Sequence, residues 1–146
     1  MRPQSIVMFE RLFLASLALS AIGFVVGYDA ALEEVTRQPG MAQLGDAGGS
    51  ILIGSMVVTT AVYLLLWFLI ARKASNVAKW FLTAFTAIGA VLFAASFVMA
   101  GITMDLNAAL MIVYYVLAVA AVVFLFKPDA EAWLKGQPAA DPAAFD

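Results

Sequence analysis

The polar cluster nearest the middle of the long apolar segments consists of hydroxyl side chains. When the segments are aligned by depth in a bilayer, the hydroxyls gather near one level, with Tyr63 and Thr83 closer to one edge. Phenols and alcohols with apolar walls suit a lipid-soluble ligand such as a quinone, a pigment or a lipid. The competing interpretation, which the sequence favours, has each hydroxyl bonded to a nearby backbone carbonyl or a neighbouring helix, at about 0.6 kcal/mol per interhelical bond. The candidate ligand-binding residues are Ser20, Thr59, Thr60, Tyr63, Tyr114 and Tyr115.

Reactive side chains are scarce. The chain contains no cysteine and no histidine, which excludes disulfides, thiolate or imidazole metal sites, and histidine ligation of haem. No nucleophile elbow, P-loop or dinucleotide-binding fingerprint occurs in the sequence. We therefore expect no catalytic activity, no metal and no cofactor.

Carboxylates near the membrane edges are the next candidates. Proton- or ion-coupled transport normally needs an ionisable group at membrane depth, and none lies deep in the apolar segments. Glu10 and Asp105 stand at opposite edges, where they fit an interfacial charge and a helix cap; a gating or substrate role for Glu10 is the alternative.

Four long stretches without a charged residue must position these side chains. Each is long enough, or nearly so, to cross a hydrocarbon core of about 30 Å as a helix. The composition agrees, because 64% of the 146 residues are hydrophobic and the mean hydropathy is +0.98. The sequence predicts an all-α membrane protein, an up-down four-helix bundle forming one domain over 1–136, with spans at about 8–28, 47–71, 77–101 and 106–126.

The basic residues are distributed unevenly between the two sides. Seven flank the spans on the side of the termini, and Arg37 alone lies on the other. By the positive-inside rule, both termini and the Arg72 to Lys79 turn are expected in the cytoplasm. The basic residues form no nucleic-acid-like patch, so we expect no nucleic-acid partner. The first stretch is too long for a secretory signal and lacks a cleavage site, so it is expected to remain as a helix.

The connections carry local signals. Asp29 predicts the start of a short surface helix that ends before Pro39, followed by a flexible link through Gly45, Gly48 and Gly49. Ser75 or Asn76 is expected to cap the third span.

After the fourth span, Pro128 predicts a short amphipathic helix over 128–135. Its Trp133 and Leu134 are expected to lie on the membrane. The Pro- and Ala-rich segment 137–146 is expected to be a disordered tail.

Small residues recur at helical spacing within the spans. In hydrocarbon, helices pack where small residues let their backbones approach. The sequence favours contacts within one bundle, with a homo-oligomer surface as the alternative. The helix-packing candidates are Gly23, Gly27, Ser50, Gly54, Thr86, Ala90 and Ala94.

Three sequence motifs at the ends of the predicted spans resemble those of a known group of proteins. They are Phe9 to Leu14, then Leu65 to Trp67 continuing through Ala71 to Trp80, and Phe124 to Trp133. With these, the chain resembles a group of small uncharacterised four-span inner-membrane proteins of proteobacteria. The resemblance implies a bacterial inner membrane and the same four-helix layout, but no activity.

The sequence therefore predicts an accessory or interaction protein of the inner membrane that acts through helix contacts in the bilayer. Its expected partners are membrane lipids and either further copies of itself or a larger membrane complex. The alternative is a transporter or binder of a small apolar or amphipathic ligand at the hydroxyl cluster.

Overall fold

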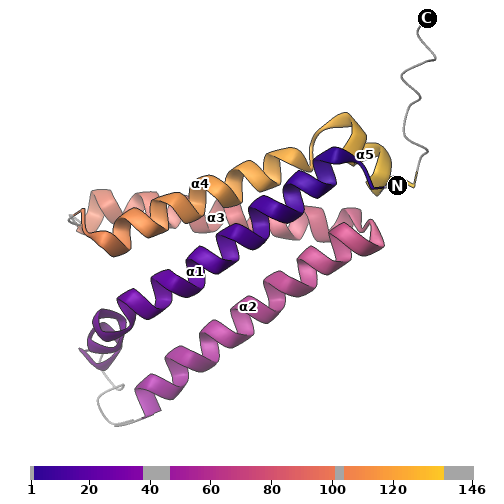
Figure 1. The fold of residues 1–146 in the computed structure, drawn as a ribbon. Coiled ribbons are helices and arrows are strands. Elements are labelled where there is room, and N and C mark those ends of the chain that lie inside the picture. Colours follow the sequence, from indigo (N-terminus) through magenta and orange to yellow (C-terminus); the bar gives the residue numbers. More distant parts are fainter. Residues whose placement is uncertain (1, 38–46, 101–103, 137–146) are drawn as a thin grey trace, which may run out of the picture.

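Every regular element that the structure describes is a helix (Figure 1). The computed structural model describes residues 2–37, 47–100 and 104–136. Within these ranges, four helices are long and apolar enough to cross a membrane. The protein is thus a multi-pass membrane protein by length and composition. The helices are α1 (Gln4–Arg37), α2 (Ala47–Lys73), α3 (Asn76–Ala100), α4 (Leu106–Phe124) and the short α5 (Pro128–Leu134).

Local capping signals set several helix ends, and the sequence predicts those at Ser75 and Asp105. Pro3 accepts hydrogen bonds from the backbone N–H groups of Ile6 and Val7, so α1 begins before its charge-free part. The Ser75 hydroxyl accepts a hydrogen bond from the backbone N–H of Ala78 (3.2 Å) at the start of α3. The Asp105 carboxylate caps α4 through the backbone N–H of Ala108 (2.7 Å).

The prediction of a separate surface helix from Asp29 is wrong, because α1 continues through that residue to Arg37. Ala30, Ala31 and Leu32 are good helix formers, and no proline interrupts the helix before Arg37. An ion pair between Glu33 and Arg37, one helical turn apart, supports the last turn. Because α1 is continuous at Asp29, this residue does not cap a helix.

The predicted flexible link is also wrong where the structure describes it. Gly48 and Gly49 belong to the first turn of α2, while Gly45 lies outside the described residues. A Cβ atom at Gly49 would stand 2.7 Å from the Tyr28 hydroxyl of α1. The glycines therefore serve close packing between two helices rather than flexibility. The proposed tail, 137–146, likewise lies outside the described residues.

The hydrophobic core lies at one end of the bundle. Figure 1 shows α5, the start of α1 and the turn between α2 and α3 meeting at this end, which we call the closed end. Side chains from all five helices form one buried cluster there, and Ile6, Phe9, Ile70, Leu82 and Leu125 are almost wholly buried. The closed end is where side chains of all five helices pack together.

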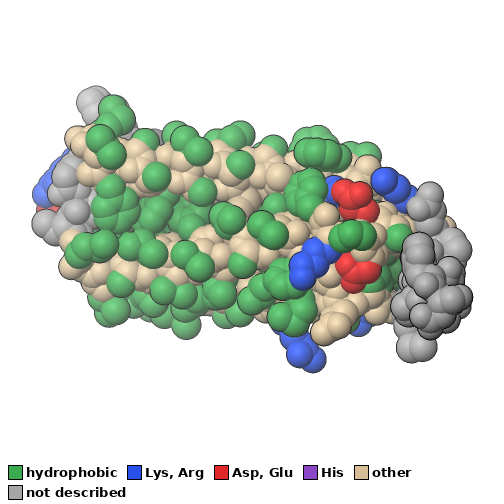
Figure 2. All heavy atoms as spheres, turned by 90° about the horizontal axis from the view of Figure 1, so that it is seen from above, with side chains coloured by type: hydrophobic (Ala, Val, Ile, Leu, Met, Phe, Trp, Pro, Cys, Tyr) green, Lys and Arg blue, Asp and Glu red, His purple; other side chains and the backbone are tan. Residues whose placement is uncertain are grey.

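Away from the closed end, α2 and α3 diverge from their shared turn (Figure 1). Their far halves expose large aliphatic side chains: Val57 and Val58 of α2 are 61% and 63% exposed, and Val91 and Leu92 of α3 are 66% and 65% exposed. We call the exposed side of these two half-helices, residues 50–62 and 88–99, the open face. Figure 2 shows hydrophobic side chains along the length of the molecule, with charged side chains toward its ends. This distribution suits a lipid surround.

The expectation that α5 lies on the membrane is wrong for Leu134. Ala130 is fully buried and Leu134 is 6% exposed, both within the core of the closed end. The chain turns sharply after α4 because Pro128 occupies the first turn of α5, and Asp129 then bonds to the start of α1. These contacts fold α5 back onto the bundle.

Candidate functional site

The predicted hydroxyl residues lie on three helices, Ser20 on α1, the threonines and Tyr63 on α2, and two tyrosines on α4. Tyr63 lies next to Phe13 of α1, with ring centroids 6.1 Å apart. This contact links α1 and α2 through aromatic side chains. Part of the cluster therefore holds helices together.

Tyr115 points elsewhere. Its ring stacks on Phe93 of α3 at 4.9 Å, and its hydroxyl lies 3.1 Å from where a Cβ atom at Gly89 would stand. Tyr115 can approach α3 closely because Gly89 has no side chain. Tyr63 and Tyr115 therefore serve two different helix pairs rather than one shared cavity.

Thr59 and Tyr63 line a shallow groove of about 220 Å³ between α2 and α3, together with Val58, Val62 and Phe85. The remaining predicted residues, Ser20 and Thr60, are half-buried and do not line this groove. Thr83 bonds the carbonyl of Lys79, one turn earlier (2.8 Å). The structure therefore brings two of the six candidates to one groove, and one neighbouring hydroxyl is bonded to backbone.

The predicted helix-packing residues fall into two groups, those packed within the bundle and those that are exposed. Gly23 and Gly27 pack beneath α4, because Cβ atoms there would stand 2.9 Å from the Met111 side chain and 2.8 Å from the Asn107 amide nitrogen. Thr86 of α3 is also buried, and Ala90 is half-buried. These residues make contacts within the bundle.

Ser50 and Gly54 lie on the open face and are exposed, as is Ala94 of α3. Nothing lies within 4 Å of a Cβ atom built at Gly54. Ser50, Gly54 and Val57 form a line along one side of α2, and no other described helix packs closely against this line at Gly54. We call Ser50, Gly54 and Val57 the α2 stripe.

Glu10 has a structural role that the sequence did not reveal. Its carboxylate pairs with Arg2, which precedes α1, and with Arg72 at the end of α2, 3.6 Å away. Its side chain is 17% exposed. Glu10 therefore joins α1 to α2 at the closed end.

Lys79 forms a second charged link at this end. Its side chain is 5% exposed, its ammonium lies 4.2 Å from the centre of the Phe126 ring, and Glu131 of α5 is 3.7 Å away. An ammonium over a ring face and beside a carboxylate is attracted by both. Lys79 thus ties the start of α3 to α5.

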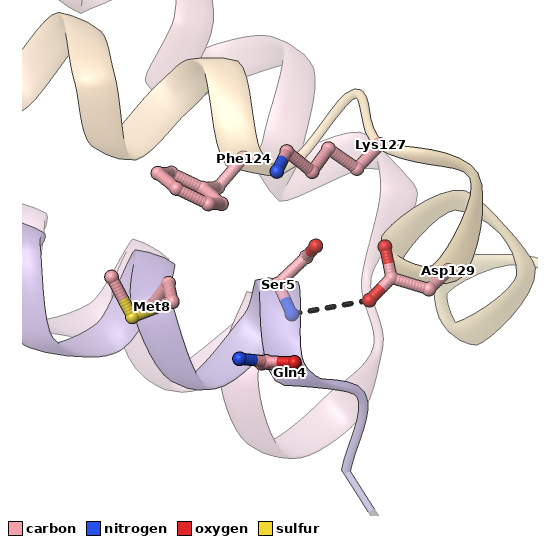
Figure 3. A pocket seen from close by; sticks show the side chains of 6 residues that line it. All are labelled: Gln4, Ser5, Met8, Phe124, Lys127 and Asp129. Atoms are coloured by element: carbon pink, nitrogen blue, oxygen red, sulfur yellow. Dashed lines mark hydrogen bonds between the residues drawn. The ribbon is translucent and has the colours of Figure 1, made fainter.

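A pocket of about 310 Å³ at the closed end was not predicted. It lies between the start of α1 and the segment from the end of α4 into α5 (Figure 3). The Ser5 backbone N–H donates a hydrogen bond to Asp129 (3.1 Å), and the Lys127 ammonium lies 4.4 Å from the centre of the Phe124 ring. Gln4, Ser5, Met8, Phe124, Lys127 and Asp129 line the pocket.

Asp129 is charged in this pocket at neutral pH. Burial acts to raise the pKa of its carboxyl, but hydrogen bonds from Ser5 and from the backbone of Ala130 and Asp129 outweigh burial and lower the pKa below its ordinary value. The pocket therefore holds a carboxylate and an ammonium together with an apolar floor. No sequence motif brings these residues together, since Ser5 and Asp129 are 124 positions apart.

In the described part of the chain, no three histidine, cysteine, aspartate or glutamate side chains are placed to hold a metal ion. Two tryptophan nitrogens, of Trp67 and Trp133, and the amide oxygen of Asn107 are buried without a hydrogen-bond partner. Each such atom carries a desolvation cost. None adjoins a pocket that the structure describes.

Comparison with family models, with curated proteins and with solved structures gave no match.

Proposed function

We propose that the protein is a non-catalytic accessory subunit of a bacterial inner membrane, which presents the open face to a second membrane protein or to another copy of itself. The observation that carries the proposal is the contrast between two small-residue lines. Gly23 and Gly27 are covered by α4 of the same chain, whereas Gly54 has open space where a Cβ would stand.

Packing energetics favour a protein contact at the α2 stripe. In lipid there is little hydrophobic drive for helices to associate, so close backbone approach at small residues supplies much of the association. Ser50, Gly54 and Val57 follow one another at i, i+4 and i+7, and therefore lie on one side of α2. A partner helix could approach there as α4 approaches Gly27.

The proposed orientation has both termini and the turn between α2 and α3 in the cytoplasm. Seven of the eight basic residues belong to the segments that meet at the closed end, and Arg37 is the exception. Positive residues near short loops are retained in the cytoplasm. The closed end would then face the cytoplasm and the end of α1 the opposite compartment.

Site-specific photocrosslinking in native membranes tests the proposed contact. A photoreactive residue in place of Val57, on the α2 stripe, is expected to give crosslinks to protein. Val25 of α1, which is 75% exposed, provides a matched control that is expected to give lipid adducts only. Lipid adducts alone from Val57, together with a monomer in several mild detergents, would refute the proposal.

A second candidate function is favoured by the groove that Thr59 and Tyr63 line beside Phe85. A small aromatic or quinone-like ligand could take hydrogen bonds from these hydroxyls while its ring packs on Phe85. Extraction of the purified protein should then yield such a ligand in a fixed ratio, and Tyr63→Phe should reduce it. Absence of any pigment, quinone or non-bulk lipid would exclude this function.

A further inference from the structure

The pocket at the closed end combines features of a lipid headgroup site. It has a base at Lys127, an acid at Asp129 and an apolar floor from Met8 and Phe124. Its volume of about 310 Å³ is at the lower end of the range of about 300–1,000 Å³ that ligand pockets occupy. The pocket therefore suits a headgroup rather than a whole lipid.

The two charges share the pocket without neutralising each other. Among the ion pairs within the described residues, none joins Lys127 to Asp129. Figure 3 shows the Lys127 ammonium turned toward Phe124, while one Asp129 oxygen is held by the Ser5 backbone N–H and the other is turned toward the side of Lys127. Each charge thus retains capacity for a partner of opposite sign.

Ser5 adds a buried polar contact. Its residue is 5% exposed, and it lines the pocket between Lys127 and Asp129. Figure 3 shows its hydroxyl directed into the space between these two side chains. The Ser5 hydroxyl lies beside Asp129, and when a ligand binds it can turn its single O–H from that carboxylate to a phosphate oxygen that the Lys127 ammonium also contacts.

The depth of the pocket matches the headgroup layer of a bilayer. Phe124 is the last residue of α4, and Met8 lies within the first turns of α1, so the apolar floor adjoins the ends of two membrane-spanning helices. Lys127 and Asp129 lie just beyond α4. Acyl chains could leave the floor along α1 and α4 toward the hydrocarbon core.

We propose that this pocket binds the headgroup of a phosphatidylethanolamine molecule, with Lys127 and Ser5 on the phosphate and Asp129 on the primary ammonium. The ammonium of ethanolamine donates hydrogen bonds that a trimethylated choline cannot donate. Asp129 repels an anionic glycerol headgroup, which would bring no cation to meet it. The site therefore selects a headgroup that carries both a phosphate and a hydrogen-bonding cation.

Competitive lipid binding tests the proposal with the full chain. The protein is reconstituted in nanodiscs of equal phosphatidylethanolamine, phosphatidylglycerol and phosphatidylcholine, and retained lipids are counted by native mass spectrometry. Phosphatidylethanolamine is expected to be retained about tenfold over each of the others, a ratio that corresponds to about 1.4 kcal/mol. Equal retention of the three lipids, or preference for phosphatidylglycerol, would overturn the proposal.

Single substitutions distinguish lipid binding in the pocket from attraction to surface charge in general. Lys127→Gln and Met8→Trp leave the Asp129 bond to α1 intact and should each lower phosphatidylethanolamine retention about tenfold. Lys73→Gln, an exposed basic position at the same end, is the matched control and should change nothing. Asp129→Asn should abolish the preference over phosphatidylcholine. Unchanged retention in both Lys127→Gln and Met8→Trp would refute the assignment.

Competition by the free headgroup distinguishes a membrane lipid from a water-soluble phosphoethanolamine compound as the ligand. Glycerophosphoethanolamine in excess is expected to compete weakly, because it lacks the acyl chains that would lie on Met8 and Phe124. Competition as strong as that of the lipid itself would overturn the part of the proposal that assigns the ligand to the bilayer.

Discussion

The closed end and the open face are built from the same kinds of residue, yet the buried hydrophobic core lies at the closed end. At the closed end, Phe9 and Ile70 are fully buried among side chains from five helices. On the open face, Val57 and Val91 are about as apolar but lie mostly exposed. The difference shows that in a membrane protein an apolar residue does not by itself specify a buried position, because lipid accepts it equally well.

Replacement of a core aromatic should produce the largest effect. Phe9 is fully buried and stacks on Phe13 with ring centroids 5.4 Å apart. Phe9→Ala is expected to lower the free energy of unfolding by about 3–5 kcal/mol, because it leaves a cavity in the closed end. Unfolding in mixed micelles of increasing SDS measures this change.

Val57→Ala provides the comparison on the open face, where the expected change is within about 0.5 kcal/mol. If Val57→Ala cost as much as Phe9→Ala in the isolated monomer, the division of the molecule into a closed end and an open face would be wrong.

Enlarging a glycine should give the next largest effect. A side chain at Gly27 would meet the Asn107 amide at 2.8 Å, whereas Gly54 has nothing within 4 Å. Gly27→Leu is expected to destabilise the monomer by about 1–3 kcal/mol through overpacking. Gly54→Leu should leave the monomer unchanged and instead weaken the proposed contact at the α2 stripe. Equal effects of the two substitutions on monomer unfolding would contradict this picture.

Removal of the charge on Asp129 should have a smaller, pH-dependent effect. Its carboxylate accepts a hydrogen bond from the Ser5 backbone N–H at the start of α1. Asp129→Asn is expected to cost about 1 kcal/mol at neutral pH.

Because the folded-state pKa of Asp129 lies below the ordinary value of 3.8, its contribution is complete above that pH and is lost as the pH falls through the folded-state pKa. Unfolding measured at neutral and at strongly acidic pH should therefore show a smaller acid sensitivity in Asp129→Asn than in the original protein. An identical pH dependence would exclude this role.

The smallest effect is expected at the far end of α1. Glu33 and Arg37 form an exposed pair one turn apart, with side chains 66% and 67% exposed. Glu33→Gln should cost about 0.3–0.5 kcal/mol, and less at high salt. The measurement is the same unfolding assay at two salt concentrations, and a salt-independent loss above 1 kcal/mol would show that this end is more tightly packed than the structure indicates.

Features that depend on a few neighbouring residues could be predicted from the sequence. The caps at Ser75 and Asp105 and the restart at Pro128 follow from hydroxyl, carboxylate and proline chemistry within one turn of each helix end. The spans follow from long runs without charge. Such signals are local, so they are read directly from the sequence.

Features that depend on distant residues could not be predicted. The pocket at the closed end needs Ser5 and Asp129 together, and Glu10 needs Arg72. Periodicity does not reveal which side of a hydrophobic helix meets a partner, so the sequence places Leu134 of α5 at the membrane surface although it is buried. Asp29 does not start a new helix, because a capping residue acts only at a helix terminus and α1 is continuous there.

Labelling of single cysteines tests the central claim most directly, because the chain has no cysteine of its own. The claim is that four helices cross the membrane with the closed end in the cytoplasm. In intact spheroplasts, an impermeant maleimide should label Gln43→Cys, between α1 and α2, and should label Asn76→Cys, at the start of α3, only after the membrane is opened. Labelling of Asn76→Cys in intact cells, with Gln43→Cys protected, would contradict the account.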